Sequence, residues 1–296
     1  MRAWLILNGK KAGRTDVREA VVALRRQGYS LEVRVTWEQG DGVRMVAEAA
    51  REGVERVIAG GGDGSLHEIA NGLMQLGPEQ QPALGILPLG TANDFATCCR
   101  IPMEPLAALR LALTGRPQPV DLGRANEEWF VNVASGGFGA SVTAETPVEL
   151  KNFLGGGAYT LMGLFKAVNF RPYACTIRTP AGEMAGSVVV GAICNGRQAG
   201  GGQPLAPAAR INDGLLDVVF LRPFAVADAA QVAAEMATTG STADHIVRLR
   251  TPWIETESHD PIPVNLDGEP VSSTHFRFEV APAAIRMVLP PDCPCL

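Results

Sequence analysis

The residues best suited to chemistry in this chain are Gly60-Gly-Gly-Asp-Gly-Ser65, which follow an apolar run and precede a helical pattern. Glycines at a strand-to-helix junction let the backbone approach a ligand, and the helix start offers amides and the positive end of a dipole. The stretch therefore predicts a phosphate site. Ser65 stands where the dinucleotide fingerprint has its third glycine, and the Lys-Ser/Thr ending of a P-loop is missing. An ordinary glycine turn is the alternative.

Four acids stand in or directly after loop-type stretches, where a carboxylate could take part in a reaction. Asp63 has glycines on both sides, so its carboxylate should be open to Mg²⁺ directly or through water. Asp94 closes a second polar loop, Asp213 lies in Asn-Asp-Gly, and Glu269 follows Asp-Gly. Asp94 and Asp213 also fit a tight turn or a helix cap, so their residue types alone leave both interpretations open. For Glu269 the residue types alone favour a tight Asp-Gly turn with a solvated side chain after it.

The first part of the chain alternates strand-like and helix-like patterns. Apolar runs predict strands at 3–7, 31–35, 57–59 and 83–89, and helical spacing predicts helices from about 15, 42, 66 and 105. Such alternation is typical of a parallel sheet. Ligands of open α/β sheets bind beyond the carboxyl ends of the strands, so we expect the Gly60–Ser65 and Gly90–Asp94 loops to line one crevice.

Beyond about residue 120 the pattern changes to short β-type runs separated by Gly, Pro, Asn and Asp. The expected strands are 129–133, 174–178, 187–194, 215–221, 262–266 and 276–280, interrupted by helical insertions at 148–170 and 225–239. This pattern predicts a mainly antiparallel second domain, either a sandwich or a barrel.

Composition narrows the class of protein. At 296 residues the chain is long enough for two domains. Its net charge of -5 argues against non-specific nucleic-acid binding, which relies on a basic surface. The apolar segments are too short to span a bilayer and the first residues do not form a signal peptide, so we expect a cytoplasmic protein.

The six cysteines do not suggest a secreted disulfide framework in a chain of this length. Cys98 and Cys99 are adjacent and cannot easily bridge each other. The spacing of Cys293 and Cys295 could suit a metal, but no histidine lies near them in the sequence. The favoured interpretation is therefore reduced, structural thiols.

Five motifs follow one another over about residues 57–270. They are Gly60-Gly-Gly-Asp-Gly-Ser65, Pro88-Leu-Gly-Thr-Ala-Asn-Asp94, Asn195-Gly-Arg-Gln-Ala-Gly-Gly-Gly202, Ile211-Asn-Asp-Gly-Leu215 and Asn265-Leu-Asp-Gly-Glu269. In this order they resemble the diacylglycerol kinase catalytic family, and the full set is similar to the bacterial YegS-type lipid kinases. Two positions depart from the family pattern. Ser65 replaces the common Thr and keeps the hydroxyl, whereas Asn8-Gly9 replaces Asn-Pro and leaves the contacts of that loop open.

The resemblance implies a two-domain fold with the active-site cleft between the domains. A Rossmann-like α/β domain, of the kind shared with NAD kinase, would comprise residues 1–122 joined by a returning segment at about 282–296. An antiparallel β-sandwich, residues 123–281, would bind the lipid substrate and a metal.

The resemblance also implies roles for individual residues. Glu269 would be the general base that takes the proton from the lipid hydroxyl, with Asp63 and Asp94 in the catalytic network. The residues implied at the nucleotide are Thr36, Gly62, Asp63, Gly64, Ser65, Leu66, His67, Glu68 and Thr91. His67 is not expected to be a catalytic histidine. We expect His67 and Glu68 to contribute through their backbone in the first helical turn, where an acid also favours the dipole.

A second divalent site is implied at the fourth motif. It would use the Asp213 side chain and the carbonyls of Arg210 and Leu215, a donor set that suits a hard cation such as Mg²⁺ or Ca²⁺. The alternative is an Asn-Asp-Gly turn that binds no metal.

These observations predict an ATP- and Mg²⁺-dependent kinase that phosphorylates the hydroxyl of a diacylglycerol-type lipid or related glycerophospholipid, such as phosphatidylglycerol, during transient contact with a membrane surface. A kinase of another acceptor, such as a sphingoid base or NAD, would share the glycine-acid loop. A binding module without turnover is a further alternative, but Asp63, Asp94, Asp213 and Glu269 together argue against it because a binder needs no base.

Overall fold

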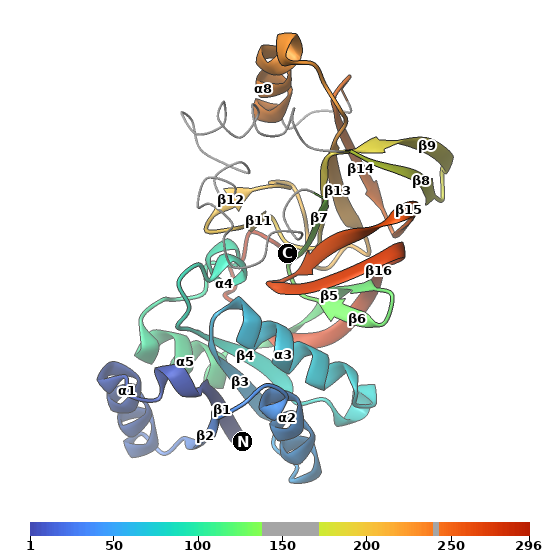
Figure 1. Ribbon diagram of the computed structural model, residues 1–296. Helices are drawn as coiled ribbons and strands as arrows, with labels where there is room; N and C mark the ends of the chain where they lie inside the picture. Colours follow the sequence, from blue (N-terminus) through green and yellow to red (C-terminus); the bar gives the residue numbers. More distant parts are fainter. Residues whose placement is uncertain (138–171, 239–242) are drawn as a thin grey trace. The chain divides into compact units, whose positions relative to one another are not determined.

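The computed structural model describes residues 1–137, 172–238 and 243–296 and divides into two compact units (Figure 1). Unit 1 is Met1–Leu122 with Pro282–Leu296, and unit 2 is Gly123–Ala281. The helical insertion expected at 148–170 lies outside the described residues. Among the residues described, no helix has the length and apolar character needed to cross a membrane.

Unit 1 is built on a parallel sheet. Its strands are β1 (Arg2–Asn8), β2 (Ser30–Thr36), β3 (Arg56–Gly61) and β4 (Ala83–Pro88), in the order β4-β3-β1-β2. The last part of β16 (Glu269–Val288) pairs parallel to β4 through Met287 and Leu84. The parallel α/β prediction is confirmed, and all four strands carry their carboxyl ends to the same edge.

Three α-helices connect these strands: α1 (Thr15–Arg26), α2 (Asp41–Arg51) and α3 (Asp63–Met74). Two more, α4 (Asp94–Cys98) and α5 (Pro105–Thr114), follow β4. The short 3-10 turns η1 (Gly9–Lys11) and η2 (Pro78–Gln80) follow β1 and precede β4. Apolar residues of α1 and α5 pack with Ala3, Leu5 and Leu7 in one buried cluster. Because side chains alternate along a strand, the buried Trp4 and Ile6 face the opposite side of the sheet.

Helix α3 begins at Asp63, three residues before the start expected from its apolar spacing. Residues 63–65 are polar or glycine, so they add nothing to the hydrophobic pattern on which the expectation rested. They nevertheless form the first turn, in which the Ser65 and Leu66 amides donate to the Gly62 carbonyl. The glycine-acid loop is therefore partly the helix start itself.

Unit 2 is antiparallel, as predicted. Its principal strands follow the order β14-β13-β10-β7-β15-β16, and β8 and β9 form a hairpin paired to β15. The bounds are β5 (Pro117–Ala125, which begins in unit 1), β6 (Glu128–Phe130), β7 (Val133–Gly137), β8 (Tyr173–Thr179), β9 (Gly182–Val188), β10 (Val190–Cys194), β11 (Gln198–Ala199), β12 (Gln203–Pro204), β13 (Leu216–Leu221), β14 (Ile246–Thr251) and β15 (Trp253–Leu266), with η3 (Val226–Asp228) before α8 (Ala229–Ala237). Its main core includes Phe130, Phe276 and Phe278.

Several strands differ in extent from their expected ranges. The single strand expected at 129–133 is divided into β6 and β7, because the backbone of residues 131–133 turns to bond with a side chain described below. The run 187–194 is likewise divided between β9 and β10. In contrast, β15 and β16 extend far beyond 262–266 and 276–280, because they pair over most of their length with a register shift between Glu257 and Ile262.

Candidate active site

Two glycine loops meet at the carboxyl edge of the unit 1 sheet. Gly62 follows β3 and Gly90 follows β4. A Cβ atom added to Gly90 would lie 2.5 Å from the Gly62 Cα, and one added to Gly62 would lie 3.0 Å from the Gly90 Cα. Side chains at either position would therefore separate the loops. This close approach fulfils the expectation that the two loops lie together.

Asp63 joins the two loops through its carboxylate. The two oxygens accept hydrogen bonds from the backbone amides of Asp94 and Phe95, each at 3.2 Å, at the start of α4. An acid is stabilised there because the first amides of a helix lack helical partners and carry the positive end of its dipole. Asp94 itself is buried, with 5% of its surface exposed. The structure thus brings together the two acids predicted for the catalytic network.

Asn93 shapes the second loop. Its backbone is left-handed, with φ of 51°, a conformation that Asn tolerates better than most side chains. Its side-chain oxygen accepts from the Gly90 amide at 2.8 Å, and its side-chain nitrogen donates to the Gly90 carbonyl at 2.9 Å. These two bonds close the Gly90–Asn93 turn. The Asn93 side chain makes no capping hydrogen bond to the first amides of α4.

The end of β1 contacts both the first glycine loop and the end of β2. The Asn8 side chain donates to the Ser65 hydroxyl at 3.3 Å, and the Gly9 amide donates to the Thr36 hydroxyl at 3.4 Å. A Cβ atom on Gly9 would lie 2.3 Å from the Thr36 carbonyl oxygen, so the close contact requires glycine. The structure therefore places Thr36 and Ser65 beside the ends of β1 and β3, and it assigns Asn8-Gly9 a supporting role that its departure from the family pattern had left open.

Glu68 contributes through its side chain rather than only through the α3 backbone. Its carboxylate accepts from the amides of Gly40 at 2.8 Å and Gly42 at 3.1 Å, at the start of α2. The acid therefore serves the amino-terminal end of the neighbouring helix. His67 is buried, and its Nε2 lies 3.3 Å from the Asn71 side-chain nitrogen. His67 is therefore held within α3 beside Asn71.

The remaining residues expected to contact the nucleotide differ in solvent exposure. Leu66 is buried in the core, so only its backbone is available to a ligand. Gly64 and Thr91 are exposed, and a Cβ atom added to Gly64 would meet no atom of the described residues within 4 Å. Open space in the first turn of a helix, next to two glycine loops, fits a phosphate chain better than it fits a packed turn. The donor set of unit 1 is therefore compatible with the phosphates of ATP and a hard cation.

In unit 2, Glu269 follows the tight turn between β15 and β16. The turn residues Asp267 and Gly268 have positive φ of 50° and 115°, and the Gly268 amide donates to the Asn265 side chain at 2.6 Å. Glu269 is exposed, and its carboxylate makes no hydrogen bond or ion pair with the described residues. The backbone beneath it is fixed while its side chain is available, which suits both the base and the turn interpretation.

Asp267 organises this region, and the sequence did not single it out. Its carboxylate accepts from the amides of Val131 at 2.6 Å, Asn132 at 3.0 Å and Val133 at 2.9 Å. The Asp267 amide in turn donates to the Val133 carbonyl at 3.1 Å. An ionised carboxylate suits three converging amides because charge-assisted hydrogen bonds are stronger than neutral ones. The bend between β6 and β7 is therefore held against the turn that precedes Glu269.

The Asn195-Gly196 motif supports the same bend. The Asn195 side chain donates to the Val131 carbonyl at 2.7 Å, and the Asn195 and Gly196 amides both donate to the Asn132 carbonyl at 2.9 Å. A Cβ atom at Gly196 would lie 2.1 Å from the Asn132 side-chain oxygen. The third and fifth motifs thus meet through residues 131–133, which carry no motif of their own.

Asp213 lies in an ion-pair cluster. One carboxylate oxygen accepts from the Leu215 amide at 3.1 Å, and the other pairs with Arg250, which also contacts Asp217 at 3.3 Å. Burial raises the pKa of Asp217, and the charge of Arg250 opposes that shift. A guanidinium thus occupies one side of the carboxylate implied to bind a divalent cation. The Asp213 oxygens still fit a hard cation, provided that the cation displaces Arg250.

Two family models match this chain, and the second extends past the end of unit 2 into residues 282–289. Residues 2–125 match the diacylglycerol kinase catalytic domain, and residues 132–289 match the YegS C-terminal NAD kinase beta sandwich-like domain. A "Probable lipid kinase YegS-like" from Shewanella frigidimarina is 52% identical over 99% of this chain and 95% of its own length. A protein of the same description from Chromohalobacter salexigens is 51% identical over 97% and 93% of the two chains.

A solved structure supports the fold independently. A diacylglycerol kinase from Bacillus anthracis aligns with a TM-score of 0.75 over 99% of this chain and 98% of its own, at 22% identity. At that identity the likeness shows the fold alone. With the full-length relatives and the two matched domains, it confirms the expected combination of α/β and β-sandwich parts. The chain therefore belongs to the YegS-like lipid kinase family, in which a diacylglycerol kinase catalytic domain precedes a YegS-type β-sandwich.

Proposed function

We propose that this protein transfers the γ-phosphate of ATP to the hydroxyl of a diacylglycerol-type lipid or a related glycerophospholipid such as phosphatidylglycerol. The observation that carries the proposal is the contact between the two glycine loops of unit 1, tied by the Asp63 carboxylate to the start of α4. Family membership supports the lipid as the class of acceptor.

Unit 1 would bind the nucleotide. The exposed first turn of α3 supplies backbone amides for phosphate oxygens, and the glycines leave the approach unobstructed. Thr36, Ser65 and Thr91 provide hydroxyl groups at the strand ends or in the loops beyond them. Mg²⁺, when bound with ATP, would neutralise charge on the phosphates, and Asp63 and Asp94 are the carboxylates that we propose would orient it.

Glu269 would act as the general base. Its exposed carboxylate can accept the proton from an acceptor hydroxyl, while Asp267 and Asn265 hold the backbone on which it stands. The hydroxyl oxygen then attacks the γ-phosphorus, the bond to the β-phosphate oxygen breaks, and ADP leaves. The proton ends on the Glu269 carboxylate.

The second divalent site is proposed at Asp213, with the carbonyls of Arg210 and Leu215. Mg²⁺ or Ca²⁺ binding there would exchange the Arg250 guanidinium for the metal, and Asp217 would keep Arg250 as a partner. The acceptor lipid is apolar, so we also propose that the enzyme contacts a membrane surface transiently during turnover.

Purified protein incubated with labelled ATP, Mg²⁺ and mixed micelles tests the proposal. Separate reactions should contain diacylglycerol, phosphatidylglycerol, a sphingoid base or NAD, with the Glu269→Gln variant as the background control. Labelled glycerolipid well above that background is expected. Transfer only to the sphingoid base or NAD would reject the proposed acceptor, and ATP binding without transfer to any acceptor would reject the kinase function.

A further inference from the structure

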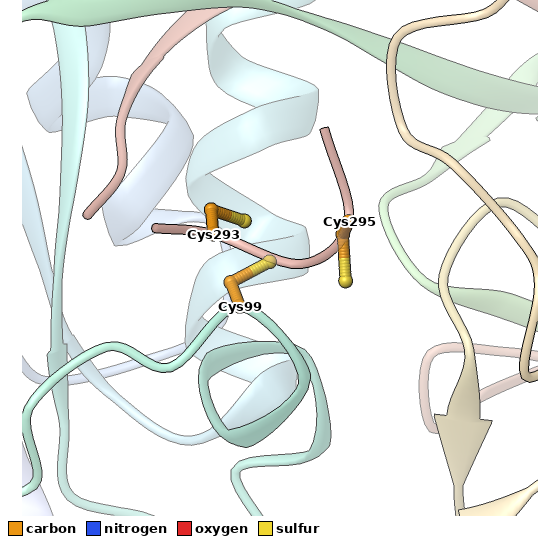
Figure 2. Close-up of side chains that lie close together, drawn as sticks. All are labelled: Cys99, Cys293 and Cys295. Carbon is orange, nitrogen blue, oxygen red and sulfur yellow. The ribbon is translucent and has the colours of Figure 1, made fainter. Parts of the chain in front are cut away.

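Four cysteines that lie far apart in the sequence converge in unit 1. Cys98 ends α4 and Cys99 follows it, whereas Cys293 and Cys295 lie in the segment after β16. The sulfur atoms of Cys99, Cys293 and Cys295 all lie within 4.8 Å of one another (Figure 2). The Cys98 sulfur lies 2.9 Å from that of Cys295. The segment after β16 is thus placed against the end of α4 by sulfur contacts.

The cluster is buried and made only of sulfur ligands. The exposed fractions are 8% for Cys98, 0% for Cys99, 7% for Cys293 and 0% for Cys295, and all are thiols rather than disulfides. No histidine or carboxylate joins the group among the residues that the structure describes. Apolar packing alone would not require sulfur at four converging positions, since alanine or valine fills such space equally well.

The spacing fits metal coordination. A tetrahedral zinc site has Zn–S bonds of about 2.3 Å, which places its sulfurs roughly 3.8 Å apart. The 4.8 Å limit on the group of Cys99, Cys293 and Cys295 admits that spacing. The Cys98 sulfur lies outside this group, and its 2.9 Å distance from the Cys295 sulfur is shorter than the spacing of a tetrahedral site but longer than the ~2.05 Å of a disulfide bond. Cys98 would therefore have to shift its sulfur to become a fourth ligand. Thiolate ligands select thiophilic ions such as Zn²⁺ over Mg²⁺ or Ca²⁺.

We propose that Cys99, Cys293 and Cys295 bind one thiophilic divalent cation, Zn²⁺ being the ion that suits their spacing, and that Cys98 completes a closed structural site as the fourth ligand when its sulfur moves away from that of Cys295. Binding exchanges the thiol protons for metal–sulfur bonds, and those protons pass to solvent. The site lacks an open position for substrate because all four ligand positions are taken by protein sulfur. It is independent of the second divalent site proposed at Asp213, which offers oxygen ligands.

The position of this site gives it a structural task. Helix α4 spans only Asp94–Cys98, so its first amides bind Asp63 while its last residue carries a cluster sulfur. A cation at the cluster would fix the segment after β16 and the far end of the helix that receives Asp63. Metal binding is therefore expected to stabilise the fold of unit 1 around the loops as well as the terminal segment.

Metal titration of the full-length protein tests the proposal directly. The protein is purified under reducing conditions, stripped with a chelator, and titrated with Co²⁺ and then Zn²⁺. We expect one ion per chain, the cobalt spectrum of tetrahedral thiolate ligation, loss of that spectrum when Zn²⁺ is added, and a higher unfolding temperature with Zn²⁺. A wild-type protein that binds no Co²⁺ or Zn²⁺ under these conditions would overturn the proposal.

Alanine variants assign the ligands. Cys293→Ala and Cys295→Ala should each weaken Zn²⁺ binding on the order of 100-fold or more, because each removes a direct ligand. Cys98→Ala tests the fourth sulfur, and an unchanged Zn²⁺ affinity would overturn the four-sulfur assignment. The buried Cys175 and Cys194 of unit 2 provide matched controls, whose alanine variants should keep wild-type affinity. Protein isolated without reductant that is lighter by two hydrogen atoms per cysteine pair and contains no metal would instead identify a disulfide and reject the metal site.

Discussion

Substitution of Gly90 by alanine should disable the proposed nucleotide site while leaving the protein folded. The new Cβ would lie 2.5 Å from the Gly62 Cα, nearly 1 Å closer than the 3.4 Å at which ordinary contact begins. Of the three nearest atoms, the Gly62 Cα and the Gly62 nitrogen at 3.4 Å are backbone, and the third is the Asn93 side-chain oxygen at 2.8 Å. Because the closest atom is backbone, the loops must separate. A displacement of about 1 Å in a catalytic arrangement costs on the order of 100-fold in rate. Overpacking adds about 1–3 kcal/mol of destabilisation.

Steady-state rates with labelled ATP and lipid micelles, together with thermal unfolding, check this expectation. Gly13→Ala is the matched control, because a Cβ there meets no atom within 4 Å and φ is not in the left-handed region. The Gly90→Ala protein should lose about 100-fold in kcat/KM and unfold at a somewhat lower temperature, whereas Gly13→Ala should match wild type. If Gly90→Ala kept activity within twofold of Gly13→Ala, the contact between the loops would not matter for catalysis and the reasoning would fail.

Four further substitutions probe other parts of the site. Asp63→Asn should lower kcat on the order of 100-fold, because the asparagine side chain has one acceptor oxygen for the two backbone N–H groups of α4 and no charge for a cation. A decrease in kcat of less than threefold would argue against this role. Glu269→Gln should lower kcat by about 10²–10⁴-fold. The unfolding temperature should not change, because the exposed Glu269 side chain makes no hydrogen bond or ion pair with the described residues. A variant that keeps the wild-type kcat would exclude Glu269 as the base. Asp267→Asn should destabilise the protein by about 2–4 kcal/mol in chemical denaturation by weakening three charge-assisted hydrogen bonds, and unaltered stability would contradict that account. Arg250→Gln should raise the affinity of Asp213 for Mg²⁺ or Ca²⁺ several-fold, as measured by calorimetry, because it removes the competing Arg250–Asp213 ion pair, worth up to about 1 kcal/mol. Weaker metal binding by the variant would mean that Arg250 assists the site.

Much of unit 1 could be predicted because its strands, helices and loops follow from sequence patterns that extend over only a few residues. Apolar periodicity located β1 to β4 and their helices, and glycine spacing located the two loops. The start of α3 at Asp63 escaped this reasoning because its first turn contains glycine and polar residues. The extent of β15 and β16 escaped it for a related reason. Their outer halves are partly exposed and polar, so their strand character comes from pairing with each other.

The partners of the site residues could not be predicted in the same way. Glu68 was expected to act within its own helix, yet its side chain accepts from the amides of Gly40 and Gly42 at the start of α2. Asp267 was treated as a turn residue, yet it binds three amides more than 130 positions earlier, at separations of 134 to 136 residues. Neither contact leaves a periodic pattern, because a side-chain-to-backbone hydrogen bond places no requirement on the neighbouring residue types.

By itself, the sequence determined the order of the elements, the parallel and antiparallel character of the two parts, and the residue types of the five motifs. These features depend on glycine, apolar spacing and turn residues, which act over a few positions. Only the tertiary structure decided which distant groups meet. It placed the Asp63 carboxylate at the first amides of α4 and Gly90 against Gly62. It also placed Cys98 beside Cys295, which lies 197 residues later in the chain. Such encounters depend on how the whole sheet and its terminal segment pack, and that packing is a property of many residues together rather than of any motif.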